Sequence, residues 1–130
     1  MDENGTQPVG ELALRMVAMP GDTNPAGDIF GGWIMSLMDL AAGTAAAARA
    51  KGRTATAAVS HLSFLKPVKV GDVVCVYTRV IRVGRTSMSL AVEAWRLSRG
   101  GLGAREKVTA AEFVMVAVDE NGRPRPVEAP

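Results

Sequence analysis

The hydrophobic positions of the chain form two kinds of pattern. In residues 11–19, Leu12, Leu14 and Met16 alternate with other residues, as they do in a strand with one buried face. Residues 29–50 instead form a long apolar run without alternation, and its last ten positions include seven alanines, which favours a helix. The sequence therefore predicts a strand followed by one long helix.

Four further segments are rich in β-branched or alternating apolar residues and are predicted to be strands. They cover residues 54–65, 73–83, 86–97 and 104–118. The stretches between them are short and turn-forming, and short connections join antiparallel strands because parallel neighbours require long crossovers. One long helix and an antiparallel sheet of about five strands make an α+β domain.

The two ends of the chain differ from this middle part. Residues 1–9 are mostly polar, with no basic start and no apolar run, so we expect a disordered tail rather than a signal peptide. Residues 10–119 are expected to form one domain. Residues 120–130 contain three prolines and are expected to form an extended tail. A cytoplasmic location is the default expectation.

The predicted helix has almost no polar face, because Asp39 is the only charged residue between positions 29 and 48. A surface helix normally keeps one polar face, so this helix should be covered on every side. Its bulkier stripe should face the sheet and consists of Ile34, Leu37, Met38, Ala41 and Ala45. Asp39 lies on another face, with Met35, Ser36, Gly43 and Ala46. A single sheet cannot easily cover both faces, so we expect an obligate dimer or higher oligomer.

A membrane-spanning helix is the alternative interpretation of this run, and composition argues against it. Alanine and glycine dominate the run, and a carboxylate at mid-membrane would be costly. The chain is 48% hydrophobic and 22% charged, which is typical of a globular domain. Its net charge of +2 does not predict nucleic-acid binding. The single cysteine, Cys75, and the single histidine, His61, argue against a disulfide and a zinc site, so we expect no metal and no cofactor.

Asp39 and the glycines before it allow two interpretations each. Asp39 could be a structural carboxylate held by backbone amides or a basic group, or it could be a general base set into a cleft. Gly31 and Gly32 begin the predicted helix, where free amides and the positive end of the helix dipole could hold an oxyanion. The same glycines could instead permit tight contact between helix and sheet.

Four stretches of the chain resemble one known family. Residues 22–41 read DTNPAGDIFGGWIMSLMDLA and are similar to the helix-start signature of hot-dog fold acyl-CoA thioesterases of the YciA type. Residues 58–74 read AVSHLSFLKPVKVGDVV, residues 83–89 read VGRTSMS, and residues 118–125 read VDENGRPR. These stretches resemble the same family. Together they span nearly the whole chain.

The resemblance implies a fold, an assembly and a substrate. In the family, one long central helix is wrapped by a curved antiparallel sheet. Two such units join their sheets, active sites form at the dimer interface, and trimers of dimers are common among relatives. The resemblance thus implies a homo-oligomer that binds acyl-CoA, with no nucleic acid and no membrane insertion.

The resemblance also implies roles for particular residues. The family's catalytic aspartate corresponds to Asp39, and its loop asparagine, which acts from the opposite subunit, corresponds to Asn24. The strand that grips the pantetheine arm of coenzyme A matches Ala57, Ala58 and Val59. A second coenzyme A contact matches Thr86, Ser87 and Met88. Arg85 could bind a phosphate group there, or it could be a solvated hairpin residue.

The reaction implied is hydrolysis of acyl-CoA to a free acid and coenzyme A. Amides near Gly31 and Gly32 would hold the carbonyl oxygen, and Asp39 would act as general base or nucleophile. Asn24 would orient the water or the carbonyl. One alternative is a hydroxyacyl-thioester dehydratase, which normally needs a histidine near its acidic residue, whereas His61 lies on a later strand. The other is a non-catalytic protein that binds or senses acyl-CoA.

Four remaining residues are given no catalytic role. His61 is expected to be a hydrogen-bonded residue at the edge of the core, although it could line the pocket. Cys75 is expected to pack in the core. Phe30 and Trp33 could shape an acyl tunnel or fill the core.

Overall fold

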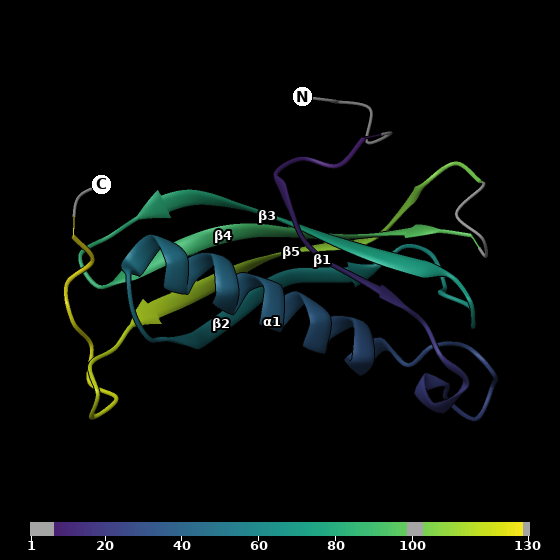
Figure 1. Ribbon diagram of the computed structural model, residues 1–130, viewed down its shortest axis with the longest axis horizontal. Helices are drawn as coiled ribbons and strands as arrows, with labels where there is room; N and C mark the ends of the chain where they lie inside the picture. The colour runs from purple at the N-terminus through teal and green to yellow at the C-terminus, as the bar shows by residue number, and fades with distance from the viewer. Residues whose placement is uncertain (1–6, 99–102, 129–130) are drawn as a thin grey trace.

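The computed structural model describes residues 7–98 and 103–128 (Figure 1). Most of the predicted tail of residues 1–9 lies outside the described residues. The elements are β1 (Glu11–Val17), the 3₁₀ helix η1 (Pro20–Asp22), α1 (Gly31–Ala50), β2 (Thr54–Phe64), β3 (Val73–Val83), β4 (Ser87–Leu97) and β5 (Glu106–Ala117). The predicted long helix and five strands are all present, and none of their bounds differs from the predicted one by more than two residues.

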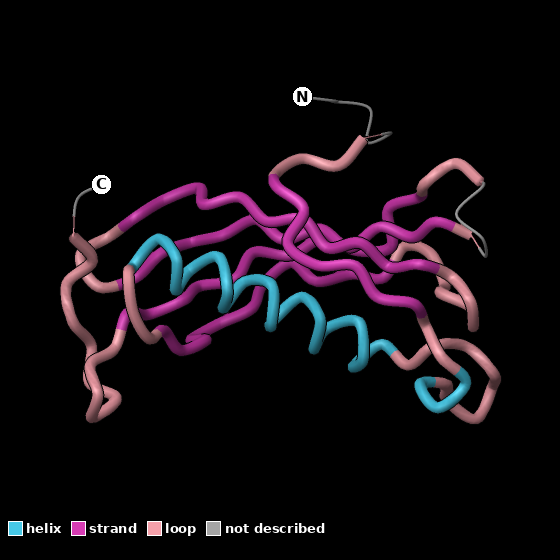
Figure 2. Tube along the Cα trace, viewed as in Figure 1, coloured by secondary structure: helices cyan, strands magenta, loops and turns pink. Residues whose placement is uncertain are grey.

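The five strands form one antiparallel sheet in the order β1-β3-β4-β5-β2. Strands β3, β4 and β5 follow one another as hairpins, whereas β1 and β2 lie at opposite edges. Helix α1 connects these two edge strands and contacts all five strands (Figure 1). The helix therefore lies across one face of the sheet, as the hot-dog fold requires, and within residues 7–98 and 103–128 no further strand pairs with either edge (Figure 2).

The core lies between α1 and the face of the sheet that it covers. The helix buries one stripe of side chains there: Ile34, Leu37, Met38, Ala41, Ala42, Ala46 and Ala50. The opposing strands contribute Met88, Leu90, Val92, Phe113 and Met115, all nearly inaccessible. The predicted sheet-facing stripe is thus confirmed, with Ala45 partly buried at its margin.

Ala46, predicted on the same face as Asp39, is completely buried, whereas Asp39 is exposed. The exposed positions of the helix step through every fourth residue, from Ser36 to Leu40 and Thr44. Four residues exceed one helical turn of 3.6, so this line rotates around the axis and moves away from Ala46.

The C-terminal segment returns to the helix end. Lys51 has a left-handed backbone, with φ of 57°, and ends the helix. The Arg125 side chain donates a hydrogen bond to the Ala50 carbonyl, at 2.9 Å, which satisfies one of the helix's last acceptors. The Val127 amide donates to the Arg85 carbonyl at 2.8 Å, so residues 119–128 fold back on the domain. Within the described part of the chain, no helix combines the length and apolar character needed to span a membrane.

Candidate active site

Asp39 lies on the exposed face of α1 and pairs with β2. The Thr56 hydroxyl donates a hydrogen bond to Asp39 Oδ1 at 2.5 Å. Thr56 faces the helix because it pairs across the sheet with Met115, a core residue. The two side chains border an open cavity of about 570 Å³, the Asp39 cavity, which is lined by Asp39, Leu40, Gly43, Thr44, Ala47, Thr54, Thr56 and Met115.

This environment differs from the structural interpretation of Asp39, in which backbone amides or a basic group hold the carboxylate. In the single chain the carboxylate is exposed, and its partner is a hydroxyl rather than an amide or a cation. Thr56 was not among the predicted site residues. The available signal was the spacing of Thr54 and Thr56, which point to the same side of a strand in a stretch otherwise rich in alanine.

Asn24 organises the loop of residues 23–29, here called the Asn24 loop. Its side-chain Oδ1 accepts hydrogen bonds from the amides of Ala26 and Asp28, at 3.0 and 3.1 Å. The backbone amide of Asn24 donates to the Asp28 carbonyl at 2.7 Å. Gly27 has a φ of 90°, a conformation that favours glycine. No described residue accepts a hydrogen bond from the Asn24 Nδ2 group, which therefore is the part of the side chain available to a ligand.

Gly31 opens the helix beside this loop. Phe30 is the N-cap and makes no side-chain cap hydrogen bond, so the first-turn amides have no side-chain cap. Gly31 borders a cavity of about 380 Å³, the Asn24 cavity, which is lined by Asn24, Asp28, Ile29, Gly31, Ile34 and residues 64–68. A Cβ atom at Gly31 would lie 3.3 Å from the Phe64 ring, so the glycine also permits close contact with β2. Both interpretations of this glycine are therefore compatible with its position.

Gly32 faces a different space. It borders a cavity of about 320 Å³, the Trp33 cavity, with Gly21, Asp22, Thr23, Phe30, Trp33 and Ser36. A Cβ atom at Gly32 would lie 2.9 Å from Phe30 Cε2, so a side chain there would make the Phe30 ring shift. Phe30 is half-exposed, so it lines this cavity rather than filling the core.

The single chain does not bring Asn24 and Asp39 together. They line different cavities. Gly31 and Asp39 are separated by eight residues of α1, or about 12 Å along the axis at 1.5 Å per residue. The two halves of the predicted site are therefore present but apart.

The residues matched to the pantetheine arm lie on the exposed edge strand β2. Ala57, Ala58 and Val59 are all exposed, and the pairing with β5 shifts between Thr56 and Ala58, so Ala57 is the extra residue of a bulge. A second irregularity follows Ser60, where His61 has φ of 61°. His61 is exposed rather than at the edge of the core.

The turn between β3 and β4 holds the other predicted coenzyme A contacts. The Arg85 side chain is exposed, and Thr86 and Ser87 are half-buried. Met88 is only 1% exposed, so its side chain belongs to the core and only its backbone could reach a ligand. The Cys75 side chain is buried, as expected.

Comparisons with known proteins agree with this architecture. The family model described as the thioesterase superfamily matches residues 26–102. The acyl-CoA thioester hydrolase YciA of Escherichia coli is 50% identical over 125 residues, covering 93% of this chain and 95% of that protein. An uncharacterized acyl-CoA thioester hydrolase of Haemophilus influenzae is 50% identical over 128 residues, covering 97% of this chain and 83% of that protein.

Solved structures show the same similarity. The hexameric thioesterase y2039 from Yersinia pestis has a TM-score of 0.90 and 48% identity, with 95% of this chain and 100% of that chain covered. HI0827, a hexameric broad specificity acyl-coenzyme A thioesterase, has a TM-score of 0.90 and 49% identity, with 98% and 88% covered.

Proposed function

The chain belongs to the thioesterase superfamily, and from this we propose that it hydrolyses acyl-CoA to a free acid and coenzyme A. The single observation that carries the proposal is the Asp39–Thr56 pair, a carboxylate held beside an open cavity in a hot-dog fold. The identity of half the residues to an acyl-CoA thioester hydrolase over nearly the full length of both proteins supports it. The predicted cytoplasmic location stays a prediction.

The active protein is an oligomer, as its structural neighbours are hexamers. We place the first interface at the edge strand β2, whose backbone groups on one side have no strand partner among the described residues. Large apolar side chains are exposed around this edge and on the nearby helix face: Met35, Leu40, Val59, Phe64 and Leu65. A second copy would bury them, and three such dimers would make a hexamer.

A two-fold axis between β2 strands would also complete the active site. Val59 is the middle residue of β2, so antiparallel pairing about it would put Thr54 opposite the partner's Phe64. Thr54 lines the Asp39 cavity, and Phe64 lines the Asn24 cavity. The interface would therefore join the Asp39 half of one chain to the Asn24 half of the other, twice in each dimer.

The reaction in this composite site is a hydrolysis. The thioester carbonyl oxygen lies against the first-turn amides at Gly31, where the helix dipole favours the negative charge that develops. Asp39 takes a proton from water while the water oxygen attacks the carbonyl carbon. The carbon–sulfur bond then breaks, the acid is released, and the coenzyme A thiolate takes up a proton. Direct attack by Asp39, through an anhydride, is the alternative route.

Coenzyme A would extend away from this centre along the edge strand. Pairing with the partner's β2 would use most of the free backbone groups of Ala57–Val59, but the bulge residue Ala57 is left out of the ladder and can offer its groups to the pantetheine amides. Arg85 offers a guanidinium to a phosphate. Gly32 lines the Trp33 cavity rather than the Asn24 cavity, so only Gly31 is assigned to the oxyanion in the Asn24 half.

The proposal is tested by release of free thiol from short-, medium- and long-chain acyl-CoAs. We expect thiol release that saturates with substrate, with a chain-length preference set by the depth of the acyl pocket. Tight binding of acyl-CoA without thiol release would instead favour the sensing protein, and would overturn the assignment.

The Thr56 hydroxyl is predicted to support the reaction by orienting Asp39. Replacement of Thr56 with Val keeps the strand-forming shape but removes the hydrogen bond, so kcat should fall about tenfold, as for a hydrogen bond to a charged group. Thr56→Ser, which keeps the hydroxyl, should retain most of the activity. Equal kcat values for the two variants would contradict this role.

A further inference from the structure

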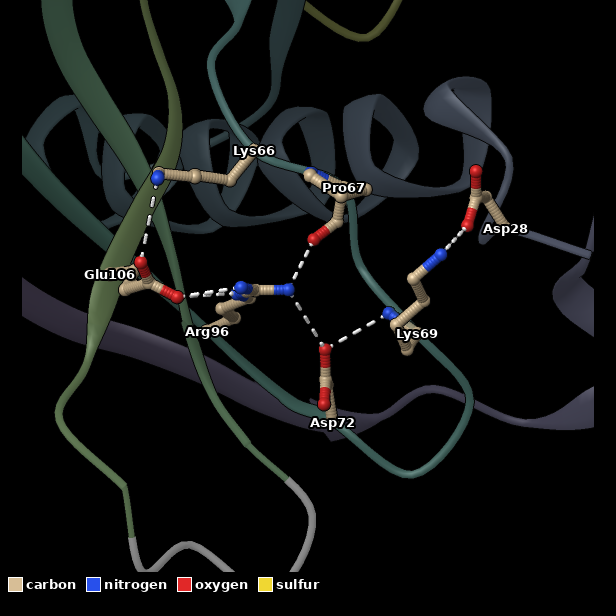
Figure 3. Close-up of polar contacts among 7 residues, drawn as sticks. All are labelled: Asp28, Lys66, Pro67, Lys69, Asp72, Arg96 and Glu106. Atoms are coloured by element: carbon tan, nitrogen blue, oxygen red, sulfur yellow. Dashed lines mark hydrogen bonds and ion pairs between the residues drawn. The ribbon is translucent and has the colours of Figure 1, made fainter.

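A chain of charged groups connects the sheet to the Asn24 loop (Figure 3). Its centre is the connection between β2 and β3, residues 65–72, here called the β2–β3 loop, which forms one wall of the Asn24 cavity. The charged residues come from the Asn24 loop, the β2–β3 loop, β4 and β5, and are Asp28, Lys66, Lys69, Asp72, Arg96 and Glu106.

One end of this chain of contacts is fixed to the sheet by Arg96. Its Nε and Nη2 atoms donate to Glu106 Oε1 at 3.1 and 2.6 Å, and its Nη1 atom donates to the Pro67 carbonyl at 2.5 Å. Nη1 also lies 3.5 Å from Asp72 Oδ2. The hydrogen bond from Arg96 holds the pKa of Glu106 below its ordinary value, so Glu106 is anionic at neutral pH. Because the Arg96 and Asp72 side chains are only 21% and 8% exposed, the contact between these two residues is largely shielded from water.

The other end reaches the Asn24 loop through Lys69. The Lys69 amide donates to Asp72 Oδ2 at 2.9 Å, and its Nζ atom is paired with Asp28 Oδ1. Asp28 is the residue whose amide and carbonyl both bond to Asn24. The Asp28–Lys69 ion pair therefore links the Arg96-anchored loop to the residues that hold Asn24.

We propose that the Asp28–Lys69 ion pair is a positioning device that holds the Asn24 loop against the β2–β3 loop. It would set the position of the Asn24 side-chain amide and of the Gly31 backbone amide relative to the thioester and the partner's Asp39. This inference rests on the proposed function. Asp28 and Lys69 are positioning residues, since they act through Asn24 and Gly31.

The pair is poorly suited to a role in stability alone. The Lys69 and Asp28 side chains are 58% and 36% exposed, and exposed ion pairs contribute little to folding. The two loops are also joined by a backbone hydrogen bond, from the Ile29 amide to the Val68 carbonyl at 2.9 Å. Loss of the pair should therefore leave the chain folded, whereas catalysis is sensitive to small displacements of the groups that orient a substrate.

The test compares Lys69→Met with a control variant, Lys107→Met. The control removes another lysine ion pair, the one between Lys107 and Glu93, and neither of these residues lines any of the three cavities of the site. We expect Lys69→Met to lower kcat about three- to fivefold, the size of one exposed ion pair, with little change in KM or thermal midpoint. Lys107→Met should keep the wild-type kcat. The reversed pair, Asp28→Lys with Lys69→Asp, should recover most of the lost rate.

Hydrogen exchange supplies a readout that does not depend on turnover. The amides of residues 24–31 should exchange faster in Lys69→Met than in wild type and Lys107→Met, because the Asn24 loop has lost one anchor. Equal kcat and equal exchange in the two lysine variants would overturn the positioning role while leaving the proposed function intact. A wild-type protein without thioesterase activity would overturn both.

Discussion

Replacing Asp39 with Asn is expected to lower kcat for acyl-CoA hydrolysis by about 10²–10⁴-fold, the usual contribution of a general base. The amide keeps the size of the side chain and an oxygen that can accept the hydrogen bond from Thr56, but it cannot take a proton from water. The same loss is expected if Asp39 is the nucleophile, because an amide oxygen is a poor one. Thiol release at saturating substrate measures kcat, and calorimetry measures binding of acyl-CoA, which should persist.

The matched control is Asp119→Asn, which makes the same chemical change in the turn after β5. Asp119 Oδ1 accepts hydrogen bonds from the amides of Asn121 and Arg123, both at 2.9 Å, and an asparagine oxygen can accept them too. This control should keep wild-type kcat. Near-normal turnover by Asp39→Asn would end the assignment of Asp39 to the chemistry, whatever the control does.

Much of the fold could be predicted from the sequence, because its signals are local. The helix follows from an apolar run without alternation, and the hairpins β3–β4–β5 follow from short turns between alternating segments. The sheet-facing stripe of the helix follows from its periodicity, and the structure buries it as predicted.

The features that could not be predicted depend on contacts between distant segments. That β1 and β2 are the two edges is a matter of strand order, which no local pattern encodes. The Asp39–Thr56 contact joins residues 17 positions apart in sequence and depends on the bulge after Thr56 as well as on the packing of α1. Met88 was expected at the coenzyme A site, and only its position on the face covered by the helix shows that its side chain is buried.

Asp39 is exposed in the single chain because no described part of that chain covers the helix face that carries it. The sequence predicts a helix covered on every side, and the chain by itself covers only one side. The exposed apolar residues around β2 lie where a second copy would supply the missing cover. A composite active site follows if that copy also brings Asn24, and mixing of subunits can test this directly.

Chains carrying Asp39→Asn and chains carrying Asn24→Ala are each expected to be nearly inactive alone and to recover activity when coexpressed in equal amounts. In a mixed dimer, Asn24 of the first chain meets Asp39 of the second, so one of the two sites is intact. Random pairing makes half of the dimers mixed, so activity should rise to about a quarter of wild type. If both residues acted within one chain, the mixture would stay as inactive as its components.

A second mixture excludes recovery by mere stabilisation of a damaged chain. When the double variant Asp39→Asn, Asn24→Ala is coexpressed with an equal amount of wild type, every mixed dimer carries one defect in each composite site. Only wild-type dimers then remain active, so activity per chain should fall to about a quarter of wild type. Sites contained within single chains would instead leave about half, because each wild-type chain would stay active in either kind of dimer. The two mixtures thus give different results for shared and for separate sites, and the Asn24–Asp39 assignment stands only if both give about a quarter.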